Sequence, residues 1–176
     1  MDDKQWQAIL DCHLTAPFRI LRAAQPHIKR LFLEEKEKGI INFRKVVNIS
    51  STSGMNGNAG QVNYATAKAG VVGMAKTMSK EWGRYNVNVN AVGFGLIKTR
   101  LTDADAEKEE SLIDIEGNKI KVGVNSAIFQ SAKTMIPLGR PGTPEEAAGA
   151  IYMFCIPESN YVTGQILMCH GGGFGL

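Results

Sequence analysis

Apolar residues recur every three or four positions along the first part of the chain and predict a long amphipathic helix that begins at Asp2 or Asp3. Pro17 lies inside this pattern, and we expect it to kink or split the helix. The charged stretch 34–38 is typical of a solvated helix end, which Gly39 closes. The chain therefore opens on a helix.

Three short apolar runs, at 45–50, 86–92 and 165–169, predict buried strands. The stretch 51–63 is rich in serine, glycine and asparagine, and we predict a loop there. Buried strands that alternate with helices indicate a parallel sheet covered on both faces, so the predicted fold class is α/β.

Two further amphipathic segments predict helices between these strands. The first spans 64 to about 83, and one of its faces carries only small residues, which suits close packing against another helix. The second follows Thr143, which caps it in a capping box with Glu146, and its apolar length ends at Pro157. Between these helices, the charged and irregular region 101–135 has the signature of a hairpin around 116–118. The small-residue face consists of Ala65, Ala69, Gly70 and Gly73.

Composition narrows the class of protein. Apolar residues make up 44% of the 176 positions, which excludes a disordered chain and leaves material for one domain with a sizeable core. The net charge of +3 is too balanced to favour nucleic-acid or membrane-surface binding. The longest apolar run, 147–156, is about half of what a bilayer span needs. The cysteines Cys12, Cys155 and Cys169 form no close pair, so we predict a reduced, cytoplasmic chain with no metal site.

Polar side chains gather where the predicted strands end. Ser50 and Ser51 close the first strand, and Tyr64 and Lys68 lie four positions apart on the next helix, hence on one face, roughly 5–6 Å apart at Cβ. A lysine cation at that range stabilises a phenolate, which helps a tyrosine to exchange a proton near neutrality. A nearby serine hydroxyl could polarise a carbonyl oxygen. Taken alone, the pair is more typical of a half-buried tyrosine beside an extended lysine.

Several segments in register carry a family resemblance. The motifs at 48–51, 58–64 and 68–70 resemble those of the short-chain dehydrogenase/reductase family, as do the later segments 88–92 and 161–165. The resemblance covers nearly the whole chain and is closest to the 3-oxoacyl-acyl-carrier-protein reductase branch. In that family the catalytic serine lies thirteen residues before the tyrosine, a spacing that selects Ser51 over Ser50.

The resemblance implies hydride transfer between NADP or NAD and a small-molecule carbonyl or alcohol, with a 3-oxoacyl thioester as one candidate substrate. Tyr64 would be the general acid and base, and Ser51 would position the substrate oxygen. Lys68 would support the tyrosine and bind the nicotinamide ribose. The backbone of Ile97 and the hydroxyl of Thr99 would meet the nicotinamide carboxamide.

The sequence departs from the family pattern at three places. His13 stands where the family often has an asparagine that supports a proton-relay water, although a packed helix histidine fits as well. The residues at 94–95 are Phe-Gly where the family has Pro-Gly. The last strand ends in His-Gly-Gly-Gly at 170–173 instead of Asp-Gly-Gly, a string also found in the oxyanion loop of lipases. No Gly-x-Ser-x-Gly accompanies it, which argues against a lipase.

The resemblance predicts that 1–176 is a single, incomplete domain, the carboxyl-terminal part of a Rossmann-like doubly wound sheet that lacks the glycine-rich first half. Segment 101–136 would be the substrate loop or lid. Two hypotheses stay open: an NAD(P)-dependent oxidoreductase, and a catalytically silent fragment that acts as a dimerisation module. The first helix and the 64–83 helix resemble a pair that forms dimer contacts in the family, so we expect a homo-oligomer, a dimer or a tetramer.

Overall fold

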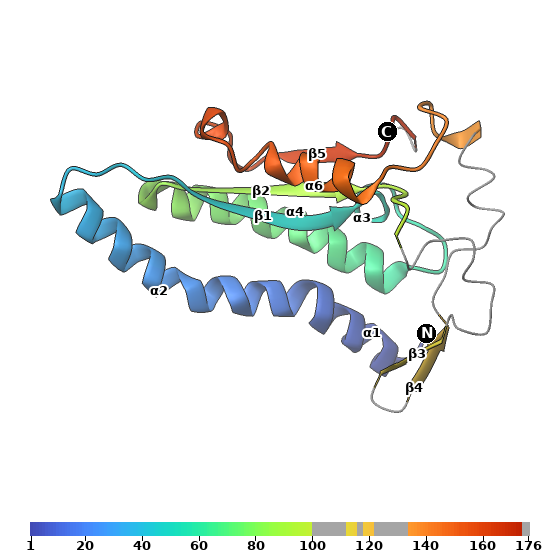
Figure 1. The fold of residues 1–176 in the computed structure, drawn as a ribbon. Coiled ribbons are helices and arrows are strands. Elements are labelled where there is room, and N and C mark those ends of the chain that lie inside the picture. The colour runs from blue at the N-terminus through green and yellow to red at the C-terminus, as the bar shows by residue number, and fades with distance from the viewer. Residues whose placement is uncertain (100–111, 116–117, 122–133, 174–176) are drawn as a thin grey trace.

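A three-stranded parallel sheet lies at the centre of the fold (Figure 1). The computed structural model describes residues 1–99, 112–115, 118–121 and 134–173. Strands β1 (Arg44–Ser51), β2 (Val87–Phe94) and β5 (Ile166–Cys169) are adjacent in the order β1-β2-β5. The three predicted strands and the α/β class are confirmed, although β2 runs two residues further than its alternating pattern indicates.

Helices cover both faces of this sheet. On one face, α4 (Val62–Trp82) packs its apolar side against β2, and Leu21 from the amino-terminal helix joins that cluster. On the other face, α6 (Pro144–Tyr152) and Phe154 pack against Val92. The capping box of α6 forms as predicted, with the Thr143 side chain accepting from the backbone N–H of Glu146.

The prediction that the last helix continues to Pro157 is wrong. Helix α6 ends at Tyr152 and is followed by turns and a short 3₁₀ helix, η5 (Pro157–Ser159). Ile156 precedes the proline and is extended, with φ −76° and ψ 156°, because the proline ring disfavours helical backbone in the residue before it.

The amino-terminal helix continues through Pro17, so the predicted split there, one of the two expected outcomes, is wrong. Helix α1 (Asp3–Leu10) passes through a π-helical turn, η1 (Asp11–Thr15), into α2 (Ala16–Glu37). Proline has no N–H, and its ring crowds the carbonyl four residues earlier. The wider π turn, in which the Ala16 N–H bonds to the Asp11 carbonyl, lies immediately before the proline and accommodates it.

Two contacts seat this helix on the rest of the fold. Near its carboxyl end, the Glu35 carboxylate accepts two hydrogen bonds from the Arg44 guanidinium, at 2.6 and 3.0 Å, which ties α2 to the start of β1. In η1, Leu14 lies against Gly70 of α4, where an added Cβ would meet the Leu14 methyl carbons at 3.0 Å. Part of the predicted small-residue face therefore receives a helix of the same chain.

The prediction of a loop over the whole of 51–63 is wrong in part, because residues Thr52–Asn56 form the short helix α3. Ser51 caps it by accepting the backbone N–H of Ser53 at 3.2 Å. Gly54 allows α3 to lie directly on α4, since a Cβ there would come within 2.7 Å of the Lys68 carbonyl carbon. A tertiary contact thus stabilises a helix that local composition disfavours.

The predicted hairpin is confirmed by the antiparallel pair β3 (Leu112–Ile115) and β4 (Asn118–Lys121). Most of the predicted lid, 101–136, lies outside the described residues.

A 3₁₀ turn, η2 (Gly83–Tyr85), connects α4 to β2. Within the described ranges, no helix is both long and apolar enough to cross a membrane.

Candidate active site

The carboxyl ends of the three strands form one edge, and the predicted site residues lie along it. In the sheet register Ser51 pairs with Phe94, and Phe94 pairs with Cys169. Helix α4 starts at the same edge, because the chain leaves β1 there and reaches α4 through α3 (Figure 1). In an open parallel sheet this edge is where ligands bind.

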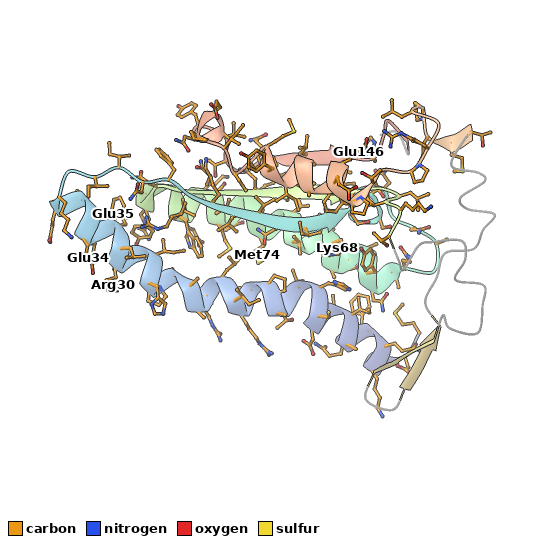
Figure 2. All side chains as sticks on the ribbon, in the orientation of Figure 1. Arg30, Glu34, Glu35, Lys68, Met74 and Glu146 are labelled. Carbon is orange, nitrogen blue, oxygen red and sulfur yellow. The ribbon has the colours of Figure 1, made fainter. Side chains whose placement is uncertain are left out.

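Lys68 is buried beneath this edge. Its side chain lies on the side of α4 that faces β1 (Figure 2) and donates a hydrogen bond from Nζ to the Ile49 carbonyl at 3.0 Å. Burial lowers the pKa of Lys68, and the nearby Cys12 thiol raises it to a smaller extent. An ammonium has three N–H donors, so two are left for other acceptors.

Tyr64 lies one helical turn before Lys68, and the structure brings the two side chains together. The Lys68 Nζ is 5.5 Å from the centre of the Tyr64 ring. Tyr64 itself is half-buried, so the phenol is neither sealed in the core nor free in solvent. The helical spacing that the sequence indicated therefore produces a tyrosine and an ammonium in one cluster.

The two serines at the end of β1 have different surroundings. Ser50 is 2% exposed and donates its hydroxyl proton to the Lys68 carbonyl at 2.8 Å, which fastens β1 to α4. Ser51, at 9% exposed, accepts the Ser53 N–H instead and retains its own hydroxyl proton for an acceptor. Ser50 therefore links β1 to α4, whereas Ser51 caps α3.

Ile97 and Thr99 follow β2 on a segment that is tied to the loop before α6. Ile97 forms a parallel bridge with Gly142, flanked by hydrogen bonds of 3.0 Å from the Gly142 N–H to the Leu96 carbonyl and 2.8 Å from the Lys98 N–H to the Gly142 carbonyl. Thr99 is exposed at the end of this described segment. A pocket of about 160 Å³ opens beside Ile97, and its lining includes Cys169 and His170.

His170 was noted in the sequence only as a departure from the family, but the structure gives it a defined tautomer. Its Nδ1 accepts the Gly172 N–H at 3.0 Å, so in the neutral ring Nε2 carries the proton. An added Cβ at Gly95 would lie 2.6 Å from the His170 Cβ, so any larger residue there requires His170 to shift. Nothing in the local sequence signals this contact, which depends on the pairing of β2 with β5.

His13, another of the three departures, lies at the site as well. Its ring is 5.2 Å from the Tyr64 ring, centre to centre, in an edge-to-face arrangement with the planes 86° apart. Burial lowers the pKa of His13, and the positive charge of Lys68 lowers it further. Among the described residues, no group of three histidine, cysteine, aspartate or glutamate side chains could hold a metal ion.

Comparison with known proteins identifies the family. A family model described as enoyl-(acyl carrier protein) reductase matches residues 1–173. The chain belongs to the short-chain dehydrogenase/reductase family. The parallel sheet with helices on both faces is consistent with a part of this family's Rossmann-like fold.

Three relatives illustrate the match to this family. The 3-oxoacyl-(acyl-carrier-protein) reductase FabG of Thermotoga maritima is 36% identical, over 98% of this chain and 58% of that protein. FabG of Aquifex aeolicus is 34% identical, over 96% of this chain and 56% of that protein. The short-chain reductase protein NovJ of Streptomyces niveus is 34% identical, over 98% and 57%. The chain thus spans under three-fifths of the length of these relatives.

Proposed function

We propose that this chain is the catalytic part of an NAD(P)-dependent oxidoreductase that reduces a carbonyl to an alcohol. The observation that carries the proposal is the cluster of Tyr64 with the buried Lys68 at the carboxyl edge of the sheet. The printed names of the relatives, which are reductases, support the same reaction class.

In this mechanism Tyr64 moves the proton. Its hydroxyl gives a proton to the substrate oxygen as the carbonyl is reduced, and the neighbouring Lys68 ammonium stabilises the phenolate that remains. Ser51 donates its hydroxyl proton to the same substrate oxygen and so holds the carbonyl against Tyr64. Lys68 is held in place by the Ile49 carbonyl, so little reorganisation is needed during the reaction.

The residues present fit the nicotinamide end of such a cofactor. Lys68 has two N–H donors beyond its bond to Ile49, which suits the two hydroxyls of a ribose. The Ile97 backbone and the Thr99 hydroxyl would hold the carboxamide. When bound, NADPH or NADH supplies the hydride. The cofactor that we propose is NADP or NAD.

The substrate we propose is a 3-oxoacyl thioester, because several relatives are named 3-oxoacyl-(acyl-carrier-protein) reductases. The test is NADPH oxidation by the purified chain with a 3-oxoacyl thioester, followed by absorbance. We expect Tyr64→Phe to lower the rate at least roughly a hundredfold. Tyr161→Phe is the matched control, since Tyr161 is fully exposed, and should retain the wild-type rate. Equal rates for wild type and Tyr64→Phe would refute the proposed role of Tyr64.

A homo-oligomer is the second part of the proposal, and it is also the basis of the alternative, a catalytically silent dimerisation module. Helix α2 exposes the apolar side chains Phe18, Ile20 and Leu33, of which Ile20 is 68% exposed. Apolar side chains along one helix favour contact with another subunit. Sedimentation should give a dimer or tetramer that Ile20→Glu weakens, and a wild-type monomer would refute this part.

A further inference from the structure

The connection between α2 and β1 exposes apolar side chains at the end of the molecule opposite the carboxyl edge of the sheet (Figure 1). We call residues 38–43 the tip. Ile40, Ile41 and Phe43 are all exposed, and Ile41 is 75% exposed. Neither the described core nor the proposed reaction uses these side chains. Three of them within four consecutive residues form an apolar patch on a protruding turn, and such patches mark contact surfaces.

The polar groups of the tip are hydrogen-bonded to Glu35, at the end of α2 (Figure 2). The Glu35 carboxylate accepts from the Asn42 side chain at 2.9 Å and from the Arg44 guanidinium, which neutralises its charge. The Glu35 carbonyl accepts the backbone N–H groups of Lys38 and Ile40, at 3.1 and 2.9 Å. A hydrogen-bonded polar group costs much less free energy to move out of water than an unpaired one, so the tip is suited to an apolar surrounding.

The excess positive charge of the chain lies around the tip. Six of the 20 basic residues and three of the 17 acidic ones fall within 29–45, so this segment carries the whole net charge of +3. Two of its acidic residues form ion pairs with arginines of the same segment. Lys36 and Lys38 are exposed and form no ion pair with another described residue. The balanced charge of the whole chain, which argued against membrane-surface binding, therefore hides a local excess.

The size and shape of the tip favour a lipid surface over a protein partner. A stable protein interface buries about 800 Å² on each side, and a turn of six residues offers much less. A protruding turn can instead penetrate the fluid boundary between lipid headgroups and acyl chains, where exposed lysines beside it contact anionic headgroups.

We propose that the tip binds the surface of an anionic phospholipid bilayer. Ile40, Ile41 and Phe43 enter the boundary between headgroups and acyl chains, and Lys36 and Lys38 lie against the headgroup phosphates. The candidate active site lies at the other end of the sheet, so it stays open to solvent while the tip is bound (Figure 1). This inference does not depend on the proposed function.

The first test measures co-sedimentation of the full chain with vesicles. We expect binding to vesicles of phosphatidylcholine mixed with phosphatidylglycerol, and at least about tenfold weaker binding to phosphatidylcholine alone. Ile41→Asp should weaken binding to the mixed vesicles at least about tenfold, because it removes an inserted side chain and adds a negative charge. Lys38→Gln should weaken it about fivefold, the effect of one lysine near an anionic surface.

Leu138→Asp is the matched control for Ile41→Asp. Leu138 is 70% exposed but lies beside the pocket at the carboxyl edge, far from the tip, and this variant should bind vesicles as wild type does. The inference would be overturned if wild type bound no vesicles, bound both kinds equally, or bound no better than Ile41→Asp.

The second test locates the tip in the bilayer. Ile41→Trp introduces a fluorophore at the tip, and brominated acyl chains in the mixed vesicles should quench its emission beyond any quenching of wild type, which has Trp6 and Trp82. Leu138→Trp should show no such additional quenching. A bound chain in which Ile41→Trp is not additionally quenched would overturn the inference. So would a wild type that binds no vesicles but self-associates through Ile41, since the tip would then be a subunit contact.

Discussion

The two sides of the site are held by different kinds of contact. On the Tyr64–Lys68 side, helices and a strand hold the residues in place, since α3 lies directly on α4 at Gly54. Two hydrogen bonds also join β1 to α4, from the Ser50 hydroxyl to the Lys68 carbonyl and from the Lys68 Nζ to the Ile49 carbonyl. On the Ile97 side, two irregular segments meet through a short backbone bridge to Gly142. The proposed proton-transfer groups are thus held by helices and a strand packed on one another, whereas the proposed cofactor contacts depend on loops.

Gly54→Val should produce the largest loss of stability, because it disrupts the packing of α3 on α4 on the Tyr64–Lys68 side of the site. The first carbon of the new side chain would lie within 2.8 Å of Lys68 and Ala69 backbone atoms, which cannot move without shifting α4. We expect a loss of about 3 kcal/mol in the free energy of unfolding, measured with denaturant, together with loss of activity.

Gly73→Ala is the matched control for that substitution. Gly73 lies in the same helix α4, and an added Cβ there meets nothing within 4 Å. Alanine should stabilise the helix by about 0.5–1 kcal/mol. A Gly54→Val protein as stable as wild type would show that the contact between α3 and α4 is not close in solution.

Lys68→Met, on the same side of the site, should lower activity strongly and stability only slightly. We expect activity to fall roughly a hundredfold or more. The free energy of unfolding should change by only about 1 kcal/mol, since losing the bond to the Ile49 carbonyl is offset by removing a buried charge. A loss of several kcal/mol would mean that Lys68 is chiefly structural.

The same variant gives a pH test with a defined sign. Because burial lowers the pKa of Lys68 in the folded chain, the unfolded chain binds more protons between the folded and unfolded pKa values. The free energy of unfolding of the wild type should therefore increase as the pH rises from the folded pKa of Lys68 to its unfolded value of about 10.4. Lys68→Met should lack that contribution, as measured by denaturation at several alkaline pH values.

Gly95→Ala tests the loop side and should have a smaller effect on stability than Gly54→Val. The new methyl group would meet the His170 Cβ at 2.6 Å, but His170 lies at the end of β5, where the chain turns and can yield. We expect a loss of about 1 kcal/mol in stability and weaker cofactor binding, followed by quenching of tryptophan fluorescence. Unchanged binding would place the cofactor away from this loop.

Glu146→Gln should have the smallest effect. The Arg140 guanidinium and the Thr143 backbone N–H lower the pKa of Glu146 to about 2, but the pair is exposed. Its stabilisation is present above the ordinary carboxyl pKa and is lost as pH falls toward about 2. Glutamine can still accept the Thr143 N–H, so the melting temperature near pH 7 should fall by about 1 °C or less. A larger drop would show that the ion pair holds the Gly142 loop.

Short-range sequence patterns were sufficient to predict most of the helices and strands. The predicted cap at Thr143 forms because Thr143 and its partner Glu146 lie three residues apart. Sequence analysis could not find α3, whose composition favours loop and whose stability depends on Gly54 fitting against α4. The π turn was also missed, and its residue Leu14 packs on Gly70, which lies 56 residues away in the sequence.

In the candidate site too, contacts within one helix could be predicted from the sequence, whereas contacts between distant segments could not. The four-residue spacing of Tyr64 and Lys68 within one helix was enough to predict their proximity. The bridge between Ile97 and Gly142 and the packing of His170 on Gly95 join segments that are 45 and 75 residues apart, and no local pattern encodes them. The roles proposed for these residues therefore depend more heavily on experiment.

The most direct test of the central claim is to follow the hydride itself. The chain is incubated with a 3-oxoacyl thioester and NADPH that carries deuterium at the transferred position, and the product alcohol is analysed by mass spectrometry. We predict one deuterium on the carbinol carbon with wild type, and almost none over the same time with Tyr64→Phe. Label transfer that is absent from folded wild type, or equal in the two proteins, would contradict the account.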